Sequence, residues 1–235
     1  MKVAIIQCDT VLSEFVAEFG SYADMIIHMF ESVDANMEYQ VFDSQRGEYP
    51  DKLDAYDFYI TTGSKACACE DHPWIKQLIG FVRQLDAQKK KLIGICFGHQ
   101  IIALARYGRV EKSTRGWGVG VAKNRIIAHP EWMKTPKDEL NIIVSHRDQI
   151  TRLPDDARVI AASDFCPCFV VQWDNHTLSI QGHPEFLPGY SGALIKHRRH
   201  ILGDKLTDAG LASLTITPDS ALFTRWILDF VTFRY

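Results

Sequence analysis

The sequence predicts an α/β fold: an open, mostly parallel β-sheet with helices on both faces, a small strand-rich insertion and a helical C-terminal tail. Two observations lead to this prediction. Short apolar runs alternate with helical patterns over residues 3–106, which is typical of a parallel sheet. Strand-like runs then follow one another with short connections over residues 118–181, before the pattern becomes helical again from Pro188. We therefore expect residues 1–235 to form a single domain.

The first half of the chain contains four expected strands and three expected helices. The strands are short apolar or alternating runs at residues 3–7, 38–42, 56–62 and 91–95. Apolar side chains recur at helical spacing from Phe15 to Phe30, which predicts one amphipathic helix. Pro73 suits the first turn of the next helix, whose buried stripe continues to Leu85. A third helix is expected at residues 100–106.

The second half contains five expected strands and a terminal helix. The strands lie at residues 118–127, 141–144, 158–162, 169–173 and 177–181. A final helix is expected near residues 221–233. No low-complexity linker, charge block or internal repeat interrupts this order.

Composition excludes several classes of function. The chain is 46% hydrophobic and 23% charged, and its formal net charge of −3 does not provide the basic surface that nucleic acids require. The N-terminal segment MKVAIIQCDT interrupts its apolar run at Gln7 and Asp9, unlike a secretion signal. No run of about 18 apolar residues is present, so we expect no membrane span. We expect a cytoplasmic protein without nucleic-acid or membrane partners, and a homo-oligomer stays among the options.

The cysteines do not indicate a disulfide framework or a metal site. Six cysteines are present, and four of them form two C-x-C pairs, Cys67/Cys69 and Cys166/Cys168. Without a secretion signal, reduced thiols are the default. Neither pair is accompanied by the further cysteine or histidine ligands that a zinc site requires. We therefore expect no metal, and we interpret these residues as buried or loop thiols.

Cys96 lies between two glycines in the stretch KLIGICFGHQ, where an expected strand gives way to a helix. The spacing Gly94-x-Cys96-x-Gly98 is that of a nucleophile elbow, in which glycines permit a tight strand-to-helix turn. A helix N-terminus beside the sulfur favours the thiolate, and the N–H of Phe97 could stabilise an oxyanion. On this motif alone, a catalytic thiol and a small core residue at a tight turn remain equally open.

A second segment, Gly182-His183-Pro184-Glu185, supplies what a thiol nucleophile needs. His183 follows an expected strand and is a candidate base, and Glu185 could orient its ring. Pro184 restricts the backbone of His183 to extended geometry, which stiffens the pair. Because a relay of cysteine, histidine and acid requires only proximity in space, the distance along the chain from Cys96 is no objection.

The segments GICFGHQ and IQGHPEF together resemble the class I glutamine amidotransferase family. The resemblance covers roughly residues 1–190 and implies a flavodoxin-like sheet. It includes the turn ITTGS at residues 60–64, the segment GWGVG at residues 116–120 and the segment VSHRD at residues 144–148. The last of these is similar to the S-H-x-D segment of GMP-synthase-like members.

The resemblance implies a role for each matching residue. Cys96 would be the nucleophile, His183 the base and acid, and Glu185 the residue that orients His183. The N–H groups of Gly63 and Phe97 would form the oxyanion hole. The substrate's amino-acid end would be held by Ser64, Gln100, Ser145, His146 and Arg147. The implied reaction is attack of a thiolate on the γ-carboxamide of glutamine, followed by hydrolysis of a γ-glutamyl thioester, with no cofactor.

Three functional hypotheses remain open. Glutamine is the default substrate, but stand-alone γ-glutamyl peptidases of this family perform the same chemistry with an amine as the leaving group. The second alternative is a glutaminase subunit that depends on a separate synthetase, because neither a synthetase domain nor a G-x-x-x-x-G-K-[ST] phosphate loop is present. The oxyanion turn also departs from the family, with Thr62-Gly63-Ser64 in place of a double glycine and proline. A module that only binds is disfavoured because the nucleophile, base and orienting acid are all present.

Several polar residues receive weaker interpretations. His99 is expected to pack or hydrogen-bond away from the sulfur. His146 competes with His183 as base but ranks below it, since Asp148 is its only neighbouring carboxylate in the sequence. The run at residues 197–200, HRRH, is interpreted as a solvated basic helix face, with a site for an acidic substrate group as the alternative.

Overall fold

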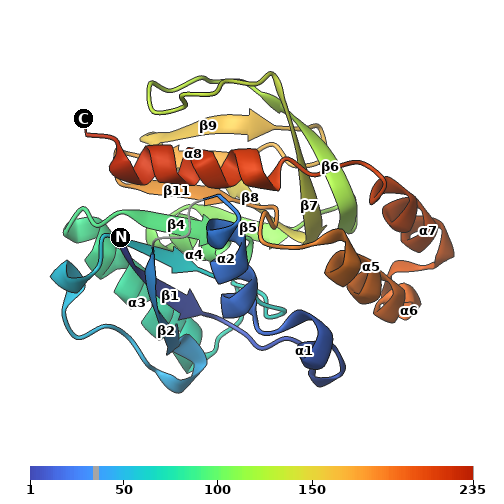
Figure 1. The fold of residues 1–235 in the computed structure, drawn as a ribbon, viewed down its shortest axis with the longest axis horizontal. Coiled ribbons are helices and arrows are strands. Elements are labelled where there is room, and N and C mark those ends of the chain that lie inside the picture. Colours follow the sequence, from blue (N-terminus) through green and yellow to red (C-terminus); the bar gives the residue numbers. More distant parts are fainter. Residues whose placement is uncertain (34–36, 235) are drawn as a thin grey trace.

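A computed structural model of the chain describes residues 1–33 and 37–234. Its centre is a nine-stranded sheet of order β2-β1-β3-β4-β11-β10-β9-β6-β7, with β5 and β8 forming a separate two-stranded sheet (Figure 1). The strands are β1 (Lys2–Gln7), β2 (Glu38–Asp43), β3 (Phe58–Thr61), β4 (Leu92–Ile95), β5 (Arg109–Lys112), β6 (Gly118–Ile126), β7 (Glu139–His146), β8 (Asp148–Arg152), β9 (Ala157–Ala162), β10 (Val170–Trp173) and β11 (Thr177–Ile180). All nine predicted strands are present, with ends moved by no more than two residues.

The helices are α1 (Ser13–Phe19), α2 (Tyr22–Glu31), α3 (Pro73–Ala87), α4 (Phe97–Ala105), α5 (Pro188–His197), α6 (Arg199–Leu202), α7 (Asp204–Ser213) and α8 (Ser220–Thr232). Two short 3₁₀ helices cover Ser44–Arg46 and Leu53–Ala55. None of the helices in the described ranges is long and apolar enough to cross a membrane.

The first half of the sheet is parallel and positions the candidate site. Strands β2, β1, β3, β4 and β11 all run in the same direction, so their carboxyl ends meet at one edge. The strand order changes direction between β1 and β3, and in open α/β sheets ligands bind in the crevice at such a point. The α/β prediction is therefore confirmed, with the flavodoxin-like order in the parallel half.

The strand-rich insertion extends the same sheet in the antiparallel sense. Strands β10, β9, β6 and β7 continue beyond β11, each antiparallel to its neighbour. Strands β5 and β8 were not predicted. Each has only four or five residues and most of β5 is exposed, so neither carries a sustained apolar or alternating pattern.

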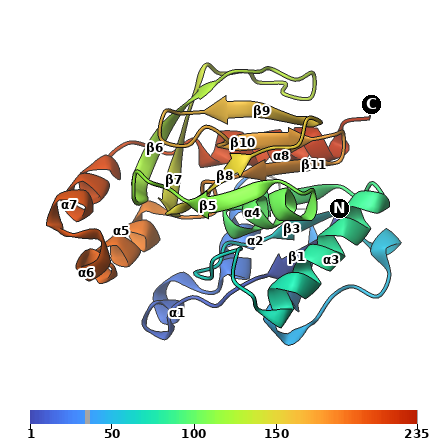
Figure 2. The same cartoon turned by 180° about the vertical axis from the view of Figure 1, so that it is seen from behind.

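Helices cover both faces of the sheet, as predicted. Helices α2 and α8 pack on one face, where apolar side chains such as Ile26, Phe30 and Trp226 join one buried cluster (Figure 1). Helices α3 and α4 cover the other face and contribute Leu78, Ile101 and others to a second cluster (Figure 2). The expected helical tail is present: α5, α6 and α7 gather beyond β6 and β7, and α8 returns to the sheet.

The single helix expected between Phe15 and Phe30 was wrong, because two helices occupy this span. Gly20 lies between them with φ +73°, a left-handed conformation that ends α1. Ser21 then caps α2: its Oγ accepts from the N–H of Asp24, and the Asp24 carboxylate accepts from the N–H of Ser21 at 2.8 Å. This reciprocal capping starts a new helix with nearly the same apolar spacing, so periodicity alone does not reveal the break.

Candidate active site

Cys96 lies at the carboxyl end of β4 and is the residue immediately before α4. Its backbone has φ +49°, which is rare for a residue with a side chain and marks a sharp turn. The flanking glycines are required by close packing: a Cβ at Gly98 would lie 1.8 Å from Thr61 Oγ1, and one at Gly94 would lie 2.4 Å from Ile102 Cδ1. The strand-to-helix turn around Cys96 therefore has the elbow geometry predicted from its glycines.

His183 and Glu185 follow β11, the strand that pairs with β4. The Nδ1 of His183 is 2.8 Å from the Glu185 carboxylate, and the ring stacks on Phe186 with centroids 3.9 Å apart. Nδ1 is thus occupied, and the ring lies near Cys96: a Cβ on Gly63 would lie 2.8 Å from His183 Cε1 and 3.7 Å from Cys96 Cβ. Nε2 is therefore the nitrogen available to the sulfur. Cys96, His183 and Glu185 are each 4% exposed.

The electrostatics of this group favour a charged imidazole. Burial by itself would lower the pKa of His183, but the charges of Cys96 and Glu185 and the hydrogen bonds to both raise this pKa above its usual value. An imidazolium beside the sulfur stabilises a thiolate. Gln181 adds a donor, since its side-chain amide is 3.6 Å from the Cys96 sulfur. Gln181 was not predicted; its position two residues before His183 was the available signal.

The two residues expected to form an oxyanion hole flank the sulfur. Phe97 is the first residue of α4, where helical N–H groups have no partner within the helix. Gly63 lies after the end of β3 and close to both catalytic candidates. A Cβ on Gly63 would lie 2.8 Å from His183 Cε1 and 3.7 Å from Cys96 Cβ. Neither N–H donates to another of the described residues. Both groups can therefore accept an oxyanion as their partner.

Asp9 holds the turn that carries Gly63. This residue follows β1 and is 4% exposed. Its carboxylate accepts from the N–H of Lys65 at 2.8 Å and from Ser64 Oγ at 3.2 Å, and it pairs with the Lys65 ammonium at 3.1 Å. Asp9 was not predicted as a site residue. An acidic residue directly after β1, at the point where the strand order changes direction, was the available signal.

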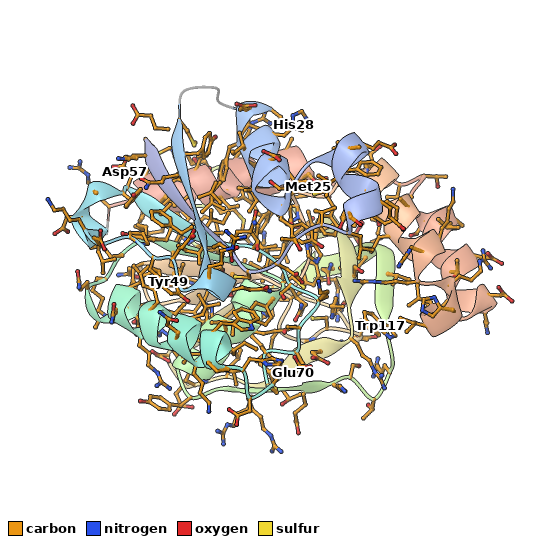
Figure 3. All side chains as sticks on the ribbon, turned by 90° about the horizontal axis from the view of Figure 1, so that it is seen from below. Met25, His28, Tyr49, Asp57, Glu70 and Trp117 are labelled. Carbon is orange, nitrogen blue, oxygen red and sulfur yellow. The ribbon has the colours of Figure 1, made fainter. Side chains whose placement is uncertain are left out.

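A cavity of about 230 Å³ begins at Cys96. All five residues predicted to bind the substrate line it, and further members are Trp117 and Glu70, both labelled in Figure 3. The predicted residues are Ser64, Gln100, Ser145, His146 and Arg147. Gln100 donates its amide to the Asp148 carbonyl at 3.0 Å and to Gln181 Oε1 at 3.2 Å. The side-chain oxygen of Gln100, Oε1, accepts no hydrogen bond from the described residues.

The two other histidines near the elbow have different surroundings from His183. Nδ1 of His146 is 3.2 Å from the Asp148 carbonyl, and burial lowers the pKa of this histidine to about 4. His146 is therefore neutral, and its Nε2 is buried without a partner among the described residues. His99 is 2.7 Å from Ser179 Oγ, and burial lowers its pKa to about 3. Within the described ranges, neither histidine is hydrogen-bonded to a carboxylate.

The basic run at residues 197–200 divides between the solvent and the cavity. Arg199 is partly exposed and pairs with Asp204 and Asp208 at 2.5 and 2.7 Å, as expected of a solvated face. Arg198 instead lines the cavity and donates to Ser145 Oγ at 2.9 Å. The interpretation of the whole run as a solvated face was therefore wrong for Arg198. Arg198 is the residue between α5 and α6, whereas Arg199 is the first residue of α6.

The remaining cysteines are free thiols without the surroundings of Cys96. Cys67 lines the cavity, but burial raises its pKa to about 12, and burial raises the pKa of Cys166 to about 12 as well. A raised pKa disfavours the thiolate that acts as nucleophile.

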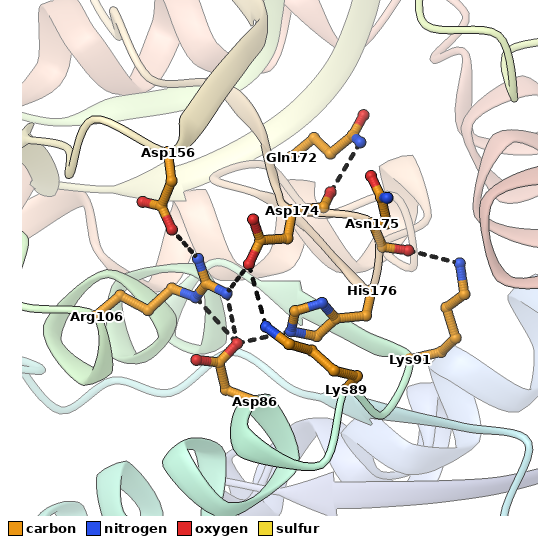
Figure 4. Close-up of polar contacts among 9 residues, drawn as sticks. All are labelled: Asp86, Lys89, Lys91, Arg106, Asp156, Gln172, Asp174, Asn175 and His176. Carbon is orange, nitrogen blue, oxygen red and sulfur yellow. Dashed lines mark hydrogen bonds and ion pairs between the residues drawn. The ribbon is translucent and has the colours of Figure 1, made fainter. Parts of the chain in front are cut away.

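One cluster in the described ranges has the residue types of a metal site. Asp86, Asp174 and His176 place potential ligand atoms within 4.8 Å of one another. Arg106 lies among them and is 2.5 Å from Asp86 and 2.9 Å from Asp174 (Figure 4). The guanidinium occupies the position that a metal would require, so the cluster is an ion-pair network.

Several known proteins are similar to this chain in sequence or in fold. The family model described as "Glutamine amidotransferase class-I" matches residues 15–200. γ-Glutamyl peptidase 2 of Arabidopsis thaliana is 35% identical over 180 residues, covering 74% of this chain and 72% of that protein. One subunit of the glutamine-hydrolysing GMP synthase of Archaeoglobus fulgidus is 32% identical over 106 residues, covering 45% of this chain and 56% of that protein. The structure of a glutamine amidotransferase from Thermotoga maritima matches the fold with a TM-score of 0.78 at 18% identity, covering 99% of this chain and 98% of that one.

Proposed function

This chain belongs to the class I glutamine amidotransferase family, and we propose that it hydrolyses γ-glutamyl amide bonds through Cys96, His183 and Glu185. One observation carries the proposal: a buried thiol at a strained strand-to-helix turn lies beside a buried histidine whose Nδ1 is 2.8 Å from a carboxylate. Nucleophile, base and orienting acid in this order are the arrangement that acyl transfer requires.

The first half of the reaction transfers the γ-glutamyl group to the sulfur. The Cys96 thiolate attacks the γ-carbonyl carbon, and the carbonyl electrons move to oxygen. The N–H groups of Gly63 and Phe97 donate to this oxyanion. As the oxyanion collapses, the C–N bond breaks and the Nε2–H of His183 protonates the departing nitrogen. The products are a free amine, a thioester on Cys96 and a neutral imidazole.

The second half regenerates the enzyme. Neutral His183 removes a proton from a water molecule, whose oxygen attacks the thioester carbon. The carbon–sulfur bond then breaks, glutamate leaves, and the thiolate and imidazolium are restored. Glu185 supports both halves by holding the ring in one orientation and by stabilising its positive charge.

The cavity offers complementary groups for the amino-acid end of the substrate. The side-chain oxygen of Gln100, at the cavity wall, is an acceptor suited to an α-ammonium group. Arg147, which is exposed at the cavity wall, offers donors to an α-carboxylate. These contacts would fix the glutamyl part while leaving the γ-carbonyl beside Cys96.

The comparisons favour a peptide or amino acid over ammonia as the usual leaving group. The relatives named γ-glutamyl peptidases match about three quarters of this chain, whereas the GMP synthase subunit matches 45% of it. Hydrolysis of glutamine for a separate synthetase is the second candidate, supported by that GMP synthase relative. It predicts that the purified chain is idle until its partner is added.

The test is a substrate panel on wild type, Cys96→Ala and Cys69→Ala, using glutamine, glutathione and γ-glutamyl-alanine. Cys96→Ala should reduce the rate by at least about 10⁴-fold, as loss of a nucleophile does in comparable relays. Cys69→Ala is the matched control, because this thiol is exposed and does not line the cavity. Equal rates in wild type and Cys96→Ala would overturn the mechanism, and no turnover of any substrate by wild type would overturn the function.

A further inference from the structure

His183 faces a smaller space than Cys96 does. This space of about 20 Å³ is lined by His183 and Gly63 on one side, and it lies next to the larger cavity. The two spaces share four lining residues, which are Ser64, Lys65, Ser145 and Arg198. Because His183 protonates the departing nitrogen in the proposed function, that nitrogen lies at this space. A substituent that extends from the nitrogen into the larger cavity passes the four shared residues.

Two of the shared residues carry a positive charge, but only one is free to bind an anion. The Lys65 ammonium pairs with Asp9 at 3.1 Å. Arg198 is half-buried, and among the described residues no carboxylate pairs with it. Its contacts are the neutral Ser145 hydroxyl at 2.9 Å and the face of Trp117, whose ring centre is 5.7 Å from the guanidinium carbon.

The surroundings of Arg198 suit a carboxylate ligand. The hydrogen bond to Ser145 uses one nitrogen of the guanidinium, which leaves further N–H donors in a planar fork. Such a fork binds a carboxylate with two parallel hydrogen bonds. The Trp117 ring and the Ser145 hydroxyl hold the side chain in place, so less conformational entropy is lost when an anion binds.

We propose that Arg198 binds a carboxylate carried by the leaving amine, so that the preferred substrates are γ-glutamyl amino acids and peptides and not glutamine. The inference rests on the proposed function, because it requires that the amine departs past His183. It adds a second anion subsite to the cavity, distinct from the contacts to the glutamyl end. Arg198 thereby determines specificity for the leaving group.

The experiment compares two substrates that differ only in this carboxylate. γ-Glutamyl-alanine and γ-glutamyl-ethylamide share the glutamyl group and an ethyl framework on the nitrogen. Wild type should hydrolyse γ-glutamyl-alanine with the higher kcat/KM. Arg198→Gln should lower kcat/KM for γ-glutamyl-alanine by about 10- to 100-fold, the usual effect of losing a charged hydrogen bond. The same variant should lower kcat/KM for the ethylamide by a smaller factor, so that the preference for γ-glutamyl-alanine falls.

Arg199→Gln is the matched control. Arg199 is the adjacent residue with the same charge, but its guanidinium pairs with Asp204 and Asp208 and does not line the cavity. This variant should leave kcat/KM unchanged for both substrates. If Arg198→Gln fails to fold, Arg198→Lys keeps the positive charge without the fork, and it should retain part of the preference for γ-glutamyl-alanine.

The outcomes separate the inference from the function on which it rests. Equal loss on both substrates in Arg198→Gln would show that Arg198 only holds Ser145 and Trp117 in place, and it would overturn the subsite. A wild type that hydrolyses both substrates equally well would overturn the subsite while leaving the proposed function intact. If wild type hydrolyses neither substrate, the proposed function fails, and the inference fails with it.

Discussion

Two pairs of a histidine and a carboxylate, one buried and one partly exposed, lie at opposite ends of the parallel strands and behave differently. His183 and Glu185 lie at the carboxyl ends of the parallel strands, 2.8 Å apart. His176 and Asp86 lie at the amino ends, 2.6 Å apart (Figure 4). Yet the pKa of His183 is raised from its usual value, whereas the pKa of His176 is lowered.

The difference comes from the third group that each histidine faces. Burial lowers the pKa of His176. The Asp86 carboxylate raises this pKa, but the positive charges of Lys89 and Arg106 oppose that rise. Arg106 donates hydrogen bonds to Asp86, Asp174 and Asp156. The Asp86 carboxylate is therefore shared between Arg106 and His176. In the part of the chain that the structure describes, no cation competes for Glu185 in this way, and His183 faces a thiol. We therefore expect the third group that each pair contacts to decide whether the pair serves catalysis or stability.

The largest expected effect separates the two histidines by substitution. His183→Gln should reduce γ-glutamyl hydrolysis by about 10⁴-fold or more, because the base and acid is lost. His176→Gln should leave kcat per folded molecule unchanged but reduce the free energy of unfolding by about 1–2 kcal/mol, through loss of a charge-assisted hydrogen bond. Steady-state rates and urea unfolding of both variants measure this. Comparable losses of kcat in the two variants would contradict the division into catalytic and structural pairs.

The next effect concerns the two carboxylates. Glu185→Gln should lower kcat by about 10²- to 10⁴-fold, since the ring loses its orienting partner. It also removes one of the charges that raise the pKa of His183. The imidazolium therefore loses its proton at lower pH, and the alkaline limb of the pH–rate profile should move to lower pH. Asp86→Asn is the counterpart and should leave the profile in place. An unmoved limb in Glu185→Gln would contradict the proposed link.

The third effect tests whether Arg106 makes the other pair structural. Its side chain is 9% exposed and contacts three carboxylates, so Arg106→Met leaves them facing one another without a cation. The free energy of unfolding should fall by about 2–3 kcal/mol, less than for a fully buried pair because the acids are partly exposed. Arg109→Met is the control, because Arg109 is exposed and, within the residues that the structure describes, pairs only with Glu111. Equal stability losses in the two variants, measured by urea unfolding, would contradict the network's role.

The sequence predicted the parts of the site that depend on local backbone geometry. The elbow at Cys96 requires glycines at two neighbouring positions, and the pair His183–Glu185 is separated by a single proline. Such constraints leave a pattern within a few residues of the chain. The parallel sheet was predictable for the same reason, since each strand forms a short apolar run of its own.

The parts that depend on distant contacts were not predictable in this way. Arg198 and Arg199 are adjacent and chemically identical, yet Arg198 lines the cavity and Arg199 pairs with Asp204 and Asp208. Asp9 matters because β1 ends beside the turn that follows β3. Packing of separate elements, which no short window of sequence contains, decides each of these contacts.

The smallest effect concerns the pH dependence of stability. The contributions of the two pairs to the free energy of unfolding should change with pH in opposite directions. The pKa of His183 is raised on folding, so its contribution is complete below the unfolded value of about 6.5 and is lost as pH rises through the folded pKa. The pKa of His176 is lowered, so its contribution is complete above about 6.5 and is lost as pH falls through the folded pKa. Above about pH 6.5, the destabilisation caused by His183→Gln should therefore shrink as pH rises, and below about pH 6.5, that caused by His176→Gln should shrink as pH falls. Each slope is at most about 1.4 kcal/mol per pH unit for one group, and urea unfolding at several pH values measures it. Slopes of the same sign would mean that the two histidines differ only in their access to substrate and not in the charges around them.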